Sequence, residues 1–251
     1  MNHNKKFYLD ILKESSHYNN LLDFNKINKL IIKNSFNLIN KSLLNLIKQT
    51  TYDNASRIIP IIIASGIDHS PLYDLLKKME QNWKIIHIPN PPGGVRVFFH
   101  IYTCIIEDLG LEILKEISLN SVNRNIVHIC VKILKIYSLS DNRKELAKRW
   151  LLGNNLNDQV LNYLNTKYDI PDNDISLEMI KLISENTNHK LVLYFDDIDW
   201  AYKEYGKHAE REILESIKRL HHYINKLSIV IINSKELWAE ILYVSGTSLS
   251  S

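Results

Sequence analysis

The chain contains four short runs of apolar residues, and most of them are separated by segments with the periodicity of a helix. A strand that is apolar at nearly every position is buried on both faces, which is typical of a parallel sheet covered by helices. We therefore predict an α/β fold in which a parallel sheet carries helices on both faces. The predicted strands are Ile58 to Ile63, Lys84 to Ile88, Leu191 to Phe195 and Leu227 to Ser234.

Helical patterns fill the long segment between the second and third predicted strands and the segment after the third. Residues 111–165 are nearly all helical by pattern, and Gly153 is expected to cap one of these helices at its C-terminus. A further helix is predicted from Leu177 to Thr187, with Ser176 as its N-cap. After the third strand we predict one long charged helix from about Tyr202 to Asn225.

The two ends of the chain differ in character. Residues 1–54 place Leu, Ile and Phe at helical spacing with Asn and Lys opposite, which predicts a helical N-terminal extension. Residues 55–251 form the predicted α/β domain, and residues 235–242 are its last expected helix. The predicted organisation is therefore a helical extension followed by one larger domain.

The composition is that of a globular protein, with 45% hydrophobic and 24% charged residues and a net charge of +3. Such a mild charge does not identify a partner. No run approaches about 18 apolar residues, so we expect no membrane association. Cys104 and Cys130 lie in apolar helical patterns and are expected to be buried, unpaired thiols, which favours a cytoplasmic location.

The third predicted strand ends in three acidic residues, Asp196, Asp197 and Asp199, within the stretch LVLYFDDIDW. Clustered carboxylates repel one another unless a cation, hydrogen-bond donors or solvent offset their charge. One interpretation is that they are solvated acids at a strand-to-helix turn, one of them capping the next helix. The other is a metal site, because ligands of open parallel sheets bind at the carboxyl ends of the strands.

The residues expected at the other strand ends suit a magnesium nucleotide. In that hypothesis Asp196 holds Mg²⁺, Asp197 polarises an attacking water, and Asn233 orients the γ-phosphate. Gly66 and Ser70 follow the first strand, where the phosphates would bind. Asparagine is also common in simple turns, so Asn233 can be read either as a phosphate-orienting residue or as a turn residue.

Several segments together resemble the P-loop ATPases of the AAA+ kind. They are IIPIIIASG, KIIHIPNP followed by FFHIYTCIIEDLG, ELAKRWLLGNN, LVLYFDDIDW and LSIVIINS. The likeness is closest to the archaeal origin-recognition initiator ATPases and the ATP-binding proteins of BREX-type defence systems. It covers about Arg57 to Ile241 and implies that Asp196 and Asp197 correspond to a Walker B acid pair.

The expected phosphate loop departs from that resemblance. A working loop reads G-x-x-x-x-G-K-[ST], in which backbone N–H groups and a lysine hold the phosphates. Residues 64–71 read ASGIDHSP, with one glycine, no lysine and an aspartate. Asp197 stands where the family has a longer Glu, so weak or absent hydrolysis is expected. We predict no cofactor or only weak Mg-ATP binding. We also expect neither the lid nor the winged-helix domain that the resembling families carry.

The expected function is that of a degenerate AAA+-like subunit that acts by interaction. The resemblance implies a protein partner, an active ATPase or a DNA-processing subunit, with DNA as a second expected partner, in replication, mobile-element maintenance or genome defence. One alternative is an active Mg-ATP-dependent, DNA-associated ATPase in which Gly66 and the N–H groups after it hold the triphosphate. Another is a simple nucleic-acid-binding module that uses the basic N-terminal helices. Their basic residues include Lys26, Lys29, Lys33, Lys41 and Lys48.

Overall fold

The computed structural model describes residues 56–63, 70–78, 83–91, 96–117, 126–138, 142–196 and 198–234, together with residues 43, 45 and 47. The chain divides into two units, Met1–Ser42 and Leu43–Ser251. The first unit lies wholly outside the described residues, so the domain boundary at residue 54 stays a prediction. The predicted N-terminal helices, the loop that contains Gly66 and the helix expected over residues 235–242 also lie outside the described part.

The described residues form a four-stranded sheet, and every strand pair in it is parallel. Its strands are β1 (Arg57–Ile63), β2 (Trp83–Ile88), β3 (Lys190–Phe195) and β4 (Ser228–Ser234). These bounds lie within one residue of the predicted ones, which confirms the parallel α/β class. The order across the sheet is β1-β4-β3-β2, so β4 lies between β1 and β3.

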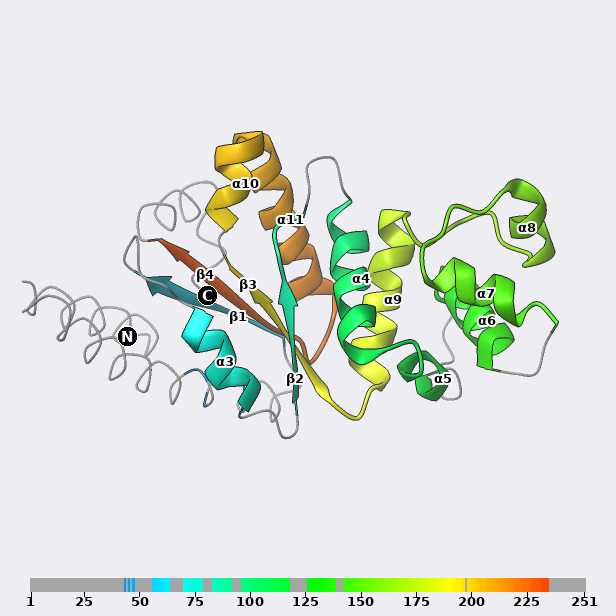
Figure 1. The fold of residues 1–251 in the computed structure, drawn as a ribbon, viewed down its shortest axis with the longest axis horizontal. Coiled ribbons are helices and arrows are strands. Elements are labelled where there is room, and N and C mark those ends of the chain that lie inside the picture. The colour runs from blue at the N-terminus through cyan, green and yellow to red at the C-terminus, as the bar shows by residue number, and fades with distance from the viewer. Residues whose placement is uncertain are drawn as a thin grey trace, which may run out of the picture. The chain divides into compact units, whose positions relative to one another are not determined.

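Helices of very different length connect these strands (Figure 1). The helices are α3 (Ser70–Lys78), α4 (Val97–Leu109), α5 (Ile113–Ile117), α6 (Ile126–Ser138), α7 (Lys144–Leu151), α8 (Asp158–Tyr163), α9 (Asn173–Asn186), α10 (Ile198–Tyr205) and α11 (Lys207–Tyr223). Helix α3 joins β1 to β2, α4 to α9 lie between β2 and β3, and α10 and α11 join β3 to β4.

Helices cover both faces of the sheet. Successive side chains of a strand point to opposite faces, so the contacts of these side chains show which helices lie on each face. On one face, the Tyr73 ring of α3 packs against His87 of β2 and Tyr194 of β3. On the other, Leu193 and Ile229 belong to the large cluster that also contains buried residues of α4, α9 and α11. The predicted two-sided covering of the sheet is confirmed for the described elements (Figure 1).

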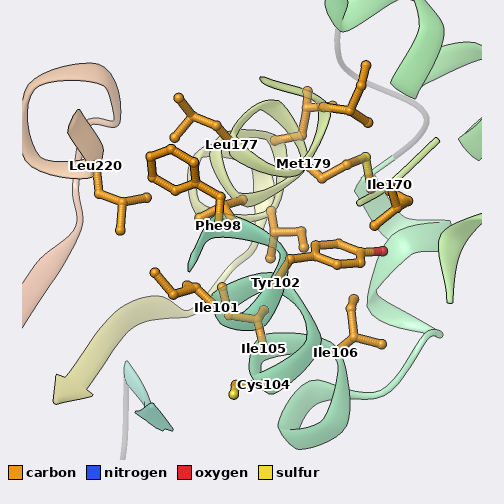
Figure 2. Close-up of a cluster of buried hydrophobic side chains, with 14 of the residues drawn as sticks. Phe98, Ile101, Tyr102, Cys104, Ile105, Ile106, Ile170, Leu177, Met179 and Leu220 are labelled. Atoms are coloured by element: carbon orange, nitrogen blue, oxygen red, sulfur yellow. The ribbon is translucent and has the colours of Figure 1, made fainter. Parts of the chain in front are cut away.

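Helix α4 lies at the centre of that large cluster. Figure 2 shows Phe98 and Tyr102 of α4 among side chains that include Leu177 and Met179 of α9 and Leu220 of α11. The Tyr102 hydroxyl donates a 2.7 Å hydrogen bond to the Leu151 carbonyl at the end of α7. Burying a polar group costs free energy unless the group is hydrogen-bonded, so this bond stabilises the packing of α7 against the core. Helices α6, α7 and α8 lie beyond α4 and α9 from the sheet (Figure 1).

Helix α7 ends at a glycine, as predicted. Gly153 has a φ of 70°, and its N–H donates to the Trp150 carbonyl at 2.9 Å. The N–H of Asn154 donates to the Arg149 carbonyl at 3.1 Å. These two bonds form a Schellman motif, which needs a left-handed residue and therefore favours glycine.

The prediction of Ser176 as a helix N-cap is wrong. Helix α9 begins at Asn173, and the Asp172 side chain caps it by accepting hydrogen bonds from the N–H groups of Asp174 and Ile175. Ser176 lies one turn inside the helix, fully buried, and its hydroxyl donates to the Ile170 carbonyl. Asp172 and Ser176 are both good caps by residue type, and the buried environment of Ser176 decides between them.

The prediction of one long helix from Tyr202 to Asn225 is also wrong. The segment forms two helices, α10 and α11, with Gly206 between them at a φ of 80° and a ψ of −179°. This is a backbone conformation that essentially only glycine adopts, and it breaks the helix. Within the described part of the chain, no helix is long and apolar enough to span a membrane.

Candidate functional site

The carboxyl edge of the sheet brings Asp196 and the end of β4 near one another. Asp196 is the first residue after β3, and β4 separates β3 from β1. Since neighbouring strands lie about 4.8 Å apart, β1 and β3 run about 10 Å apart across β4. Phe195 and Pro60 both pair with Ile231, so β1 extends three residues beyond the end of β3. The connections that leave β1 and β3 run to helices on opposite faces of the sheet, and ligands of open α/β sheets bind at such a point.

The Asp196 carboxylate is bonded to a histidine of the neighbouring strand. His87 Nε2 lies 2.9 Å from Asp196 Oδ2, the distance of a charge-assisted hydrogen bond. The pair forms because β2 lies beside β3 with His87 opposite Tyr194, which places the imidazole two residues before the acid on the same face. The side chain of His87 is 39% exposed and that of Asp196 is 24% exposed, so the pair is partly accessible to solvent.

Two tyrosines hold the His87 ring in place. The ring centroids of Tyr73 and His87 lie 5.3 Å apart, those of His87 and Tyr194 lie 6.1 Å apart, and those of Tyr73 and Tyr194 lie 5.2 Å apart. Tilted aromatic contacts at such separations are favourable. One side chain from α3 and one from β3 therefore pack against the imidazole that binds Asp196.

The hydrogen bond to Asp196 raises the pKa of His87 above its ordinary value. Burial of the ring opposes this shift, and the negative charge of Asp196 adds to it. The acidic end of β3 thus has a positive partner whenever the imidazole is protonated. This arrangement meets the electrostatic need of the carboxylate with a residue of the chain itself.

Asn233 and Ser70 are placed differently from Asp196. Asn233 is buried at the end of β4, and the alternation of side chains puts it on the same face as Ile229 and Ile231, opposite to His87. Ser70 is exposed at the first position of α3. Asp196 is therefore the candidate whose side chain lies on the face of α3.

The other candidates for the metal and phosphate site lie outside the described residues. These are Asp197 and Gly66, together with the side chain of Asp199. Within the described part, no three His, Cys, Asp or Glu side chains gather to hold a metal ion.

Two basic residues of neighbouring elements form contacts with groups other than Asp196. Lys77 of α3 forms a 3.1 Å ion pair with Asp108 of α4. Arg96, which follows the Pro/Gly loop after β2, donates a 2.6 Å hydrogen bond to the Pro171 carbonyl.

Two observations bear on whether a magnesium–triphosphate group could bind here. The carboxylate that would bind the metal is already bonded to an imidazole, and residues 64–71 contain no lysine for the phosphates. No protein-family model matches the chain, and no curated protein matches it either.

Sequence reasoning missed His87. The signal was present in KIIHIPNP, where a histidine interrupts an otherwise apolar strand one residue before its end. A lone polar residue in such a strand indicates a partner on an adjacent strand. The partner could not be named, because the order of the strands across the sheet was not predicted.

Proposed function

We propose that this chain is a degenerate AAA+-like subunit that has lost nucleotide hydrolysis and acts through interaction with a protein or DNA partner. Its setting would be replication, mobile-element maintenance or genome defence, as the resemblance implies. The observation that carries the proposal is the 2.9 Å hydrogen bond between His87 and Asp196. The imidazole, when it is protonated, would compete with a cation for the Asp196 carboxylate.

The architecture supports the proposal. A parallel sheet with helices on both faces persists, and its acidic strand ends at the sheet edge where ligands bind. Residues 64–71 contain no lysine or arginine to neutralise a triphosphate. A sheet retained without these residues is the expected form of a subunit whose role is structural or regulatory.

Isothermal titration of the full chain with Mg-ATP tests the proposal. The expected result is no heat of binding up to millimolar nucleotide for the wild type and for Asp196→Asn. Micromolar binding by the wild type that Asp196→Asn abolishes would contradict the proposal and favour the alternative, an ATPase with an atypical phosphate loop.

Asp108→Asn is the matched control for the titration. It removes one carboxylate from a described ion pair on α4 without changing the acidic strand end. If Mg-ATP binds the wild type, this variant must bind it equally well for the loss in Asp196→Asn to identify the site.

A further inference from the structure

Ser56, the residue before β1, joins that strand to the turn between α11 and β4. Its hydroxyl accepts a 3.0 Å hydrogen bond from the Leu227 N–H and donates one to the Ile224 carbonyl. The Arg57 N–H donates a 2.9 Å hydrogen bond to the Leu227 carbonyl. One serine side chain therefore binds the backbone at both ends of the turn that leads into β4. We call these contacts the Ser56 junction.

The Ser56 junction affects β1 because that strand lies at the end of the described sheet. Its strand partner there is β4, and Arg57 lies opposite Ser228 at the start of their pairing. A strand paired along one edge separates from a sheet more readily than a strand paired along both. Loss of the Ser56 junction would therefore open the pairing of β1 with β4 from its first residues.

The turn inside the Ser56 junction has a conformation that costs free energy. Lys226 has a φ of 63°, in the left-handed region that residues other than glycine seldom adopt. Such a residue persists where surrounding contacts fix it, and here Ser56 binds the backbone on either side of it. Opening of the Ser56 junction would relieve this cost, so the turn itself favours the open form.

Two histidines at the end of α11 adjoin the Ser56 junction. The half-buried His221 ring is hydrogen-bonded to the Ser56 backbone, and its centroid lies 5.0 Å from that of His222 in an edge-to-face arrangement. Burial lowers the pKa of His221, and the positive charge of His222 lowers it further. The bond to Ser56 opposes this shift without reversing it. The closed junction therefore favours a neutral His221.

The charged groups on either side of His221 do not offset the charge that its protonated ring would carry. On α11 itself, Lys218 lies one turn earlier and forms a 3.0 Å ion pair with Glu215. At the Ser56 junction the charged side chains of the described residues are the cations Arg57 and Lys226.

The helices packed against α11 place their charges elsewhere. Helix α4 meets α11 through the Phe98 ring, which lies 5.2 Å from the Arg219 guanidinium carbon. Helix α10 has eight residues and adjoins the first turns of α11, whereas His221 lies in its last turn. The acids of α9 act on the Tyr223 hydroxyl, and they are Glu178, Glu185 and Asp174.

We propose that the Ser56 junction is an acid-sensitive switch, in which protonation of His221 opens the junction and releases the amino end of β1 from β4. The open form leaves the imidazole in solvent, where its pKa is about 6.5, so the open form binds the proton more tightly than the closed form does. The stability of the closed junction is fully present above that pH and is lost as pH falls below it. One proton changes the opening equilibrium by at most about tenfold per pH unit.

Hydrogen exchange of the full chain at pH 7.5 and pH 5.5 tests the proposal. Protection factors, from which the intrinsic pH dependence of exchange has been divided out, are compared for β1 and β3. In the wild type the protection of β1 should fall between about twofold and tenfold at the lower pH. That of β3 should stay the same, because β3 is paired on both sides.

Three variants on α11 identify the group that titrates. His221→Gln should abolish the pH dependence, because glutamine carries no charge and can still bind the Ser56 backbone. His222→Gln should reduce it, since it removes the charge beside His221. His208→Gln is the matched control and should behave like the wild type. It changes an exposed histidine in the first turn of the same helix, about 20 Å away along the axis.

Three outcomes would overturn the proposal. The protection of β1 is the same at both pH values, or it falls as much in His221→Gln as in the wild type. In the third, β3 loses as much protection as β1, which would show acid unfolding of the whole protein. The pair of His87 with Asp196 acts in the opposite sense, because the raised pKa of His87 makes acid strengthen it. The proposal goes beyond the proposed function and does not depend on it, because exchange is measured without nucleotide.

Discussion

His87 Nε2 and Asp196 Oδ2 lie 2.9 Å apart, so the acidic end of β3 is paired with an imidazole from the adjacent strand. The pair gives the carboxylate at the end of this apolar strand a hydrogen-bond partner from the chain itself. It also gives the stability of the protein a defined dependence on pH.

The stabilisation from this pair should fade as the pH rises. The pKa of His87 is raised in the folded protein, chiefly by the hydrogen bond to Asp196. Its contribution is therefore fully present below the unfolded pKa of about 6.5 and is lost as pH rises through the folded value. Asp196→Asn should lower the free energy of unfolding by about 1 kcal/mol or less near pH 6, and by less near pH 9. Urea unfolding at both pH values measures this difference.

Asp108→Asn is the control for that experiment. It removes an acid whose partner is Lys77, which stays charged across this pH range. Its effect on the free energy of unfolding should not change between the two pH values. An equal pH dependence in both variants would show that the His87 pair is not its source.

Gly153→Ala should destabilise the protein by about 2 to 4 kcal/mol. Its φ of 70° costs an alanine about 1 kcal/mol, and the added Cβ would lie 2.4 Å from Phe99 Cε2, a clash that adds about 1 to 3 kcal/mol. In a Phe99→Leu background the clash is relieved, so the cost of Gly153→Ala should fall towards the backbone cost alone. Thermal unfolding of the four proteins of this cycle gives the coupling, and a coupling of zero would contradict the contact.

Tyr102→Phe should cost about 1 to 2 kcal/mol, because it leaves the buried Leu151 carbonyl without its donor. Burial raises the pKa of Tyr102, so the hydroxyl stays neutral and able to donate throughout the usual pH range. Tyr168→Phe, at an exposed position after α8, is the control and should have no measurable effect. Chemical denaturation of both variants checks the difference, and equal stabilities would rule out the contribution of the hydrogen bond.

The two thiols should react slowly in the folded protein. Both are free and buried, and burial raises the pKa of Cys104 to about 11 and that of Cys130 to about 12. Since the thiolate is the reactive form, a thiol reagent such as DTNB at pH 8 should modify native Cys130 only as fast as the protein unfolds. In denaturant both should react at once. Rapid modification of native Cys130 would contradict its burial.

The sheet was largely predictable, and the reason is physical. Strands buried on both faces, such as KLVLYF of β3, are apolar at nearly every position. Such a strand can therefore be predicted without knowing which strands lie beside it. The glycine that ends α7 was predictable for a similar reason, because the left-handed conformation is a local requirement.

The candidate site was less predictable because it depends on which strands are neighbours. His87 and Asp196 are 109 residues apart in the chain and meet only because β2 lies beside β3. Asp172 rather than Ser176 caps α9 because Ser176 is buried, and burial is a property of the tertiary structure. The break at Gly206 was visible as a glycine, but helical periodicity continues across it and favoured one helix.

The most direct test of the account is the pKa of His87, measured by NMR in the wild type and in Asp196→Asn, with and without millimolar Mg-ATP. The His87 signal is identified by its loss in His87→Gln. The account predicts a pKa above 6.5 in the wild type, a lower pKa in Asp196→Asn, and no effect of Mg-ATP on either. An ordinary pKa that Asp196→Asn leaves unchanged, or a His87 signal that Mg-ATP shifts in the wild type, would contradict it.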